Sequence, residues 1–150
     1  MKVIVTSDSH GKIDILKEIS IKYPDANLFI DAGDSDSRTE EISPFLSVRG
    51  NCDLLIKNNY RVDTINGVSI YTTHGNTLFF NDKYLAMMAT KYSCKIAIHG
   101  HTHIPKVTYV DGVHILCPGS VSRPRGGSKP SYAVITFNNE FDISIEIKEI

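Results

Sequence analysis

Short apolar or β-branched runs recur along the sequence, and each one stops at a polar segment that contains glycine. The runs cover residues 3–5, 28–30, 47–49, 68–73 and 95–98. Runs of this length, bounded by glycine-containing loops, indicate buried strands. Buried strands must be covered on both faces, by helices or by a second sheet.

Helical periodicity fills part of the intervals between these runs. A helix capped by Asp14 is expected to follow the first run and to end at Pro24. A weak, proline-interrupted helix is expected around residues 42–46, and a further helix begins at Asn81 or Asp82. Strands and helices therefore alternate in the first part of the chain.

The later strands are predicted to pair as hairpins, because turn signals separate them. The turns are expected at Asn66-Gly67, Asp111-Gly112 and Asn138-Asn139. They join residues 60–65 with 68–73, 106–110 with 113–116, and 132–137 with 141–147. Helical connections early and hairpins late predict one α/β domain over residues 1–150, with two sheets packed face to face and helices outside.

Seven side chains that can bind a metal stand where the predicted strands end. They are Asp8, His10, Asp34, Asn51, His74, His101 and His103. Loops beyond the carboxyl ends of strands meet at one edge of an α/β sheet, so these side chains are expected to converge. Two pairs, Asp8 with His10 and His101 with His103, have a spacing of two residues, which in extended backbone places both side chains on the same side.

The chemistry of this set points to transition metals. Four imidazoles, two carboxylates and one amide are too rich in nitrogen for a calcium or magnesium cage, so manganese, iron, nickel, cobalt or zinc is indicated. Seven ligands fit two ions better than one, since a bridging carboxylate would give each ion four ligands and leave room for water and substrate. A hydroxide held there could attack phosphorus in line, which predicts phosphoester hydrolysis without a protein nucleophile.

The motifs that carry these residues resemble, in their order, those of the calcineurin-like metallophosphoesterase superfamily. They are Asp8-Ser9-His10, Gly33-Asp34, Gly50-Asn51-Cys52-Asp53, His74-Gly75 and Gly100-His101-Thr102-His103. The short length and the Pro118-Gly119-Ser120 run are similar to the small, single-domain prokaryotic phosphodiesterase branch. The resemblance implies a four-layer αββα sandwich of two mixed sheets.

The resemblance also implies how the ligands divide between two divalent ions. One ion would take Asp8, His10, Asp34 and His103, and the other Asp34, Asn51, His74 and His101, so that Asp34 is the bridge. Manganese is favoured as the metal, with nickel, iron, cobalt and zinc left open. Asn51 and His74 are the ligands expected to act in catalysis as well.

Two residues are expected to face the substrate. Arg125 is favoured as a phosphate clamp, because the resemblance places its loop at the rim of the site. Cys52 stands where many superfamily members have a histidine that protonates the leaving group or binds the phosphate. A thiol is a poorer acid for this step, so activity on alkyl esters is expected to be low. Asp53 either orients a ligand or caps a turn, and Asp31 and Asp36 are expected to be solvated loop acids.

Composition limits the partners. The 150 residues include 16 Lys and Arg against 17 Asp and Glu, and the formal net charge of −1 supplies no field for nucleic acid or an anionic membrane. The three cysteines form no CxxC pair, and the first residues form no signal peptide, so a cytoplasmic location is predicted. The expected substrate is a small phosphoester, and a homo-oligomer remains open.

A second class of function stays open beside catalysis. The scaffold subunit of the eukaryotic retromer coat is similar in fold, retains much of the ligand pattern and serves chiefly as a docking surface. It also lacks the histidine at the position of Cys52. The alternative prediction is therefore a protein-binding module with a vestigial metal site.

Overall fold

The computed structural model describes residues 1–150, which form ten strands and two helices. The strands are β1 (Lys2–Thr6), β2 (Leu28–Asp31), β3 (Leu46–Ser47), β4 (Tyr60–Ile65), β5 (Val68–Thr73), β6 (Ile96–Ile98), β7 (Lys106–Val110), β8 (Val113–Cys117), β9 (Ser131–Phe137) and β10 (Ile143–Glu149). The helices are α1 (Ile13–Lys22) and α2 (Asp82–Lys91). The strands form two mixed five-stranded sheets, ordered β10-β9-β1-β2-β3 and β4-β5-β6-β8-β7.

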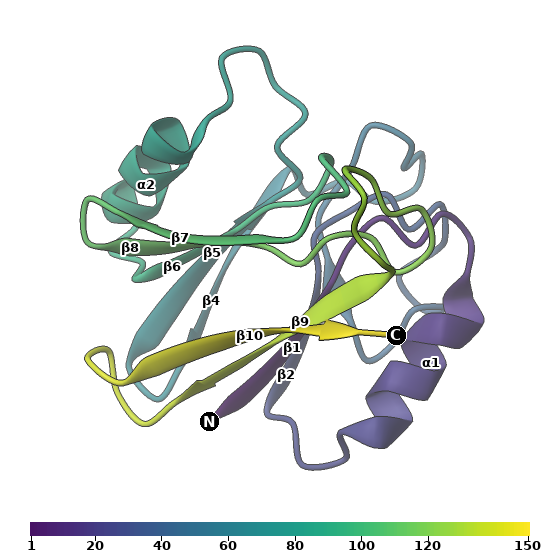
Figure 1. Cartoon of the computed structure of the whole chain (residues 1–150), viewed down its shortest axis with the longest axis horizontal. Helices are drawn as coiled ribbons and strands as arrows, with labels where there is room; N and C mark the ends of the chain where they lie inside the picture. Colours follow the sequence, from purple (N-terminus) through teal and green to yellow (C-terminus); the bar gives the residue numbers. More distant parts are fainter.

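The two sheets face each other, and one helix covers the outer side of each (Figure 1). The alternation of side chains along each strand explains these layers, because successive residues point to opposite faces. In β1, Val3 and Val5 belong to the core between the sheets, whereas Ile4 packs with Leu16 and Ile19 of α1. In the other sheet, residues of β5, β6 and β8 pack against the buried face of α2. The predicted sandwich of two sheets with helices outside is therefore confirmed.

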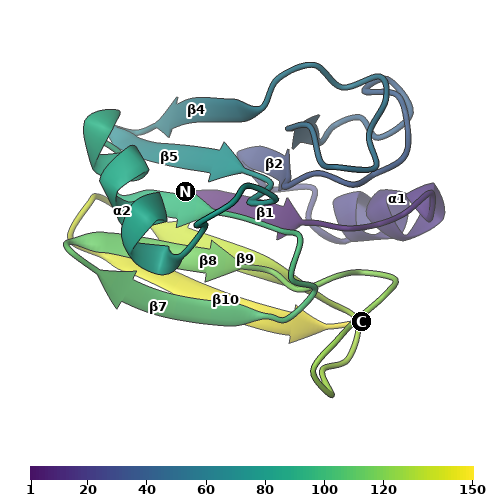
Figure 2. The same cartoon turned by 90° about the horizontal axis from the view of Figure 1, so that it is seen from above.

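The direction of the strands determines where the site forms. β1, β2 and β3 are parallel neighbours in one sheet, and β5, β6 and β8 are parallel neighbours in the other. Figure 2 shows β1, β5 and β8 pointing the same way, so that both sheets present their carboxyl ends at a common edge. The loops after β1, β2, β5 and β6 thus meet, as the sequence predicted.

Two hairpins agree with their predicted turns. Asn66 and Gly67 have φ of +48° and +79° and join Ile65 to its partner Val68, and a left-handed pair at residues 111–112 joins β7 to β8 in the same manner. The last hairpin differs, since β10 begins at Ile143 and not at residue 141. The intervening residues close the turn through hydrogen bonds to the side chain and carbonyl of residue 139, so they are unavailable to the ladder.

Three local predictions were wrong. Asp14 does not cap α1; Lys12 occupies that position and Asp14 lies in the first turn, where its charge complements the helix dipole. The weak helix around residues 42–46 is a series of turns, because the ring of Pro44 is incompatible with a helix interior. The strand expected at residues 47–49 is β3 (Leu46–Ser47), which starts one residue earlier and is shorter. Asn81 does cap α2, and its Oδ1 accepts the Tyr84 N–H at 2.8 Å.

Both helices contain ten residues. Neither has the length and apolar content that crossing a membrane requires.

Candidate metal centre

The structure brings all seven predicted ligands together at the common edge of the sheets, in two groups. In the first group, Asp8 Oδ1 lies 3.1 Å from His103 Nε2 and 4.0 Å from His10 Nε2. In the second, Asn51 Oδ1 lies 3.1 Å from His74 Nε2 and 3.0 Å from the Nδ1 of His101.

Asp34 and Asp8 connect the two groups. The Oδ2 atom of Asp34 lies 3.4 Å from His74 Nε2, and Asp8 Oδ1 lies 3.9 Å from the same nitrogen. Two sets of donor atoms, Asp8 with His10 and His103, and Asp8 with Asp34 and His74, are each close enough to share one ion.

The backbone reaches this arrangement by a route that the sequence analysis did not predict. Asp8, His10, His101 and His103 have φ of +54°, +45°, +67° and +59°, and Asp34 has φ of +56°. These residues are therefore left-handed and not extended, so the argument from extended backbone was wrong although the pairs do converge. Left-handed backbone costs of order 1–3 kcal/mol at each such residue, and strain of this kind concentrates at functional sites.

Hydrogen bonds between Nδ1 and backbone carbonyls orient two of the imidazoles. Nδ1 of His74 lies 2.7 Å from the carbonyl of Ala32, and Nδ1 of His103 lies 2.6 Å from the carbonyl of Arg123. Because a carbonyl only accepts, each Nδ1 carries a proton, and Nε2 of the neutral ring carries a lone pair. That lone pair faces the oxygen acceptors of the neighbouring ligands, so a proton or a cation must lie between them.

Hydrogen bonds also orient the carboxylate of Asp8. Its Oδ2 accepts the Ser7 hydroxyl at 2.5 Å and the His101 N–H at 3.1 Å. Its Oδ1 and the Nε2 of His10 are buried and have no hydrogen-bond partner. Buried, unpaired polar atoms are costly, and the convergence of these two atoms fits the binding of a cation. The donor set and these unpaired atoms therefore fit a divalent transition metal.

The carboxylate of Asp53 holds two ligand loops together. Its Oδ2 accepts N–H groups of Asp34 and Gly50, both at 2.8 Å, and its Oδ1 accepts that of Asp36 at 2.9 Å. Its Oδ1 also lies 3.4 Å from the hydroxyl of Ser35. Of the two alternatives left open for Asp53, the structure thus supports the role of orienting a ligand.

Two glycines permit the close approach of these loops. A Cβ on Gly50 would lie 2.0 Å from Asp34 Oδ1, and a Cβ on Gly100 would lie 2.0 Å from Ser7 Oγ and 2.9 Å from Asp8 Oδ2. Side chains at these positions would displace the two carboxylates, so the absence of a Cβ is a condition for the geometry.

The ionisation of the centre reflects burial and mutual attraction. Burial raises the pKa of Asp8 despite the nearby His74. Burial also opposes ionisation of Asp34, but hydrogen bonds from His74 and Cys52 outweigh it and hold its pKa below the ordinary value. Burial lowers the pKa of His74, and its bond to Asp34 overcomes this and raises it. A bound divalent cation would replace the proton between these groups.

The two residues expected to face the substrate are exposed. Arg125 lies in the loop next to His103, whose carbonyl accepts the Arg125 N–H at 3.2 Å. Cys52 donates its N–H to Asp34 Oδ1 at 2.8 Å. Burial and then the charge of Asp34 raise the pKa of the Cys52 thiol to about 11, which keeps it protonated at neutral pH. A thiol with this pKa is a weaker acid than the histidine that it replaces.

The structure corrects the expectation for Asp31 and shows contacts of other residues that the sequence analysis missed. Asp31 is not solvated but completely buried, and burial raises its pKa to about 7. Asp36 is exposed as expected, yet its Oδ2 lies 3.2 Å from His10 Nδ1. The hydroxyls of Ser120 and Ser122 both donate to the Asp8 carbonyl, at 2.7 and 3.1 Å. The proximity of residues 118–120 to the site was signalled only by the family motif.

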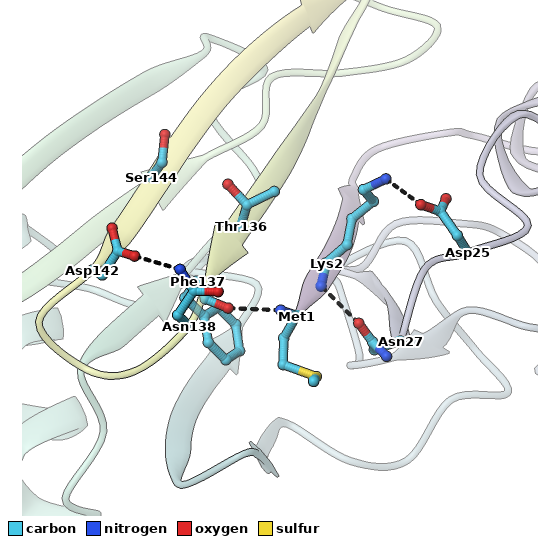
Figure 3. Close-up of a pocket in the computed structure, with 9 residues that line it drawn as sticks. All are labelled: Met1, Lys2, Asp25, Asn27, Thr136, Phe137, Asn138, Asp142 and Ser144. Carbon is cyan, nitrogen blue, oxygen red and sulfur yellow. Dashed lines mark hydrogen bonds and ion pairs between the residues drawn. The ribbon is translucent and has the colours of Figure 1, made fainter.

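A cavity of about 530 Å³ lies at the opposite edge of the molecule, beside Met1 and the end of β9. Figure 3 shows that its charged groups are paired, whereas the hydroxyls of Thr136 and Ser144 have no partner drawn. The amino group of Met1 donates to the Phe137 carbonyl, and Lys2 contacts Asp25. None of the seven predicted ligands lines this cavity.

Comparison with known proteins agrees with the fold. A family described as the calcineurin-like phosphoesterase superfamily domain matches residues 1–140. The "Probable metallophosphoesterase YsnB" of Bacillus subtilis is 30% identical over 147 residues, which cover 93% of this chain and 86% of that protein. The chain therefore belongs to the calcineurin-like phosphoesterase superfamily, whose metallophosphoesterase members imply divalent metal ions.

Solved structures show the same architecture. A conserved protein of Streptococcus pneumoniae, described as a predicted phosphoesterase, has a TM-score of 0.83 and 26% identity, covering 98% of this chain and 97% of that one. Vps29 of Entamoeba histolytica, solved in complex with zinc, has a TM-score of 0.74 and 20% identity, covering 100% and 98%. The second likeness shows a shared fold.

Proposed function

We propose that this protein is a phosphodiesterase with a two-metal centre. Asp8, His10 and His103 would hold one ion, Asn51, His74 and His101 the other, and Asp34 would bridge them. The observation that carries the proposal is that two ring nitrogens with a lone pair lie opposite oxygen acceptors. Nε2 of His74 and Nε2 of His103 each lie 3.1 Å from an oxygen atom of another ligand, while the Nδ1 atom of each ring donates its proton to a backbone carbonyl. Both nitrogens are therefore placed where a bound cation would satisfy them, one in each of the two groups of ligands.

The protein groups supply binding and orientation. When bound, two such ions lower the pKa of water and neutralise charge on the phosphate oxygens. Asn51 and His74 would hold the second ion, and the Asn51 amide oxygen, which lies 3.1 Å from His74 Nε2 and 3.0 Å from His101 Nδ1, orients these donors. Arg125, at the rim, would clamp a non-bridging phosphate oxygen, and Cys52 would contact the leaving group while keeping its proton.

The diester is proposed from the resemblance of the motifs to the small prokaryotic phosphodiesterase branch. Two divalent ions would outweigh the charges of Asp8 and Asp34 and would attract a diester and a monoester alike, so the charge of the loaded centre does not select between the two esters. The weak acid at Cys52 further restricts good substrates to esters with stable leaving groups.

The test compares hydrolysis of a bis-aryl phosphodiester and the matching aryl phosphomonoester by manganese-loaded protein. We expect diester turnover that chelation abolishes and manganese restores, and a higher kcat/KM for the diester. Asp34→Asn should lower the kcat/KM for the diester by more than about 100-fold, because loss of a residue that only hydrogen-bonds to a metal ligand already lowers activity by about 10–100-fold. Asp14→Asn, an exposed carboxylate in α1, is the matched control and should retain full activity. Preference for the monoester would contradict the diester assignment.

A docking module remains the second candidate, and exposed apolar residues near the site favour it. Leu54 follows Asn51 by three residues and is 88% exposed, while Leu78 and Phe79, on the loop after His74, are 88% and 91% exposed. The fold shared with Vps29 agrees with such a role. If fully metal-loaded protein turns over neither ester, the docking module replaces the enzyme.

We further propose that residues 1–150 act as one domain in the cytoplasm. The two sheets share a single apolar core, which supports one folding unit. The three cysteines are unpaired and Cys52 is exposed, which fits a reducing compartment.

A further inference from the structure

A second cluster of metal-binding atoms lies beside the centre. One donor atom each from His10, Asp36 and Cys52 lies within 4.8 Å of the other two. Only His10 belongs to the seven-residue set. The other two residues are exposed, so this cluster opens to solvent at the mouth of the site.

The contacts of this cluster orient its atoms for a shared ligand. His10 Nδ1 lies 3.2 Å from Asp36 Oδ2, and the His10 side chain is only 5% exposed. Asn51 Nδ2 lies 3.3 Å from Cys52 Sγ and donates to it, which fixes the position of the sulfur. The backbone N–H of Cys52 donates to Asp34 Oδ1 at 2.8 Å, which holds Cys52 next to the loop that carries Asp34 and Asp36.

We propose that His10, Asp36 and Cys52 form a separate site for zinc, and that zinc bound there withdraws His10 from the two-metal centre. Sulfur, nitrogen and carboxylate oxygen are the ligands that Zn²⁺ takes in proteins, with water completing four-coordination. Thiolate selects zinc over manganese, so the site discriminates between the two ions. On binding, the thiol releases its proton to solvent, and zinc exchanges water molecules for the three side chains.

Competition for His10 follows from the chemistry of its ring. A neutral imidazole has one lone pair, on either Nδ1 or Nε2. Nδ1 faces Asp36 and Nε2 faces Asp8, so one neutral ring serves one of the two sites at a time. Zinc therefore acts as an inhibitor at a position that shares only His10 with the seven-ligand set. Inhibition of ester hydrolysis by zinc rests on the proposed function, whereas zinc binding at this cluster does not.

Binding is tested without turnover, with cobalt(II) as the spectroscopic substitute for zinc. Cobalt added to metal-free protein should give a thiolate-to-cobalt charge-transfer band, and an excess of zinc over all the metal positions should remove it. Cys52→Ser should abolish the band, Asp36→Asn should weaken cobalt binding at least about tenfold, and Asp14→Asn should change neither. A band that persists in Cys52→Ser, or no band in the parent protein, overturns the site.

A thiol reagent gives a second readout. Cys94 and Cys117 are buried, so an aromatic disulfide should label Cys52 selectively in the folded protein. Zinc should slow this labelling at least about tenfold and manganese should not. Equal labelling rates with and without zinc overturn the proposal.

Inhibition is then measured on manganese-loaded protein with the bis-aryl diester. For each protein, half-inhibition is measured against the rate of that same protein without zinc. The zinc concentration that gives half-inhibition should be at least about tenfold higher for Cys52→Ser than for the parent protein. An unchanged value overturns the inhibitory role. A protein that gives the cobalt band and turns over no ester refutes the proposed function and leaves the zinc site supported.

Discussion

Replacement of Asp53 by asparagine tests how the ligand loops are held. The buried carboxylate accepts N–H groups of Asp34, Gly50 and Asp36 within 2.9 Å. Asparagine offers one acceptor oxygen, so its amide nitrogen must face at least one of these donors. An unsatisfied buried donor costs about 1–3 kcal/mol, and the loss of the charge-assisted bonds adds to it, so Asp53→Asn should destabilise the protein by about 3 kcal/mol.

That loss corresponds to a fall in Tm of about 6–12 °C for a domain of this size. The displaced loops should also weaken manganese binding by about 10–100-fold. Thermal unfolding of the metal-free protein and calorimetric titration with manganese measure the two effects separately, with Asp14→Asn as the isosteric control. If Asp53→Asn and Asp14→Asn agree in both Tm and manganese affinity, Asp53 does not hold the loops and the reasoning is refuted.

Three further predictions concern single positions. Gly50→Ala should weaken manganese binding at least about tenfold, because its Cβ would lie 2.0 Å from Asp34 Oδ1, whereas Gly67→Ala, with open space around its Cβ, should not; equal titrations would contradict this. The pKa of Asp31 is about 7 in the folded protein against an ordinary 3.8, so its stabilisation is present below about pH 4 and lost as pH rises through 7. Between about pH 4 and pH 7 this group should lower the free energy of unfolding, measured with denaturant, by about 4 kcal/mol, and Asp31→Asn should remove that fall. Parallel pH profiles for the parent protein and Asp31→Asn would refute the prediction. Cys52→His should raise the rate on alkyl relative to aryl diesters, and an unchanged ratio counts against the role of Cys52 in leaving-group protonation.

The parts of the fold set by local chemistry could be predicted from the sequence. The turns at Asn66-Gly67 and Asp111-Gly112 require left-handed backbone that few residue types adopt readily, and the structure has both. Strand ends could be located because apolar runs stop abruptly at polar residues. Parallel strands then bring those ends to one edge, so the convergence of Asp8 and His103 followed from topology.

The parts set by tertiary contacts could not be predicted. Asp31 looked like a loop acid, but it ends β2 and accepts the Ser47 hydroxyl inside the protein at 2.7 Å. The left-handed φ of Asp8 and Asp34 has no local signal, because loops from four strands impose it. Asp53 and Asp36 could not be distinguished from ordinary turn acids until their partners, 17–26 positions away, were in place.

The central claim is that two cations occupy one site at the common edge of the two sheets, and anomalous diffraction from manganese-loaded crystals tests it directly. The account predicts two peaks about 3.5–4 Å apart, one bordered by Asp8, His10 and His103 and the other by Asn51, His74 and His101, with Asp34 between them. A single peak, or peaks away from these side chains, would contradict it.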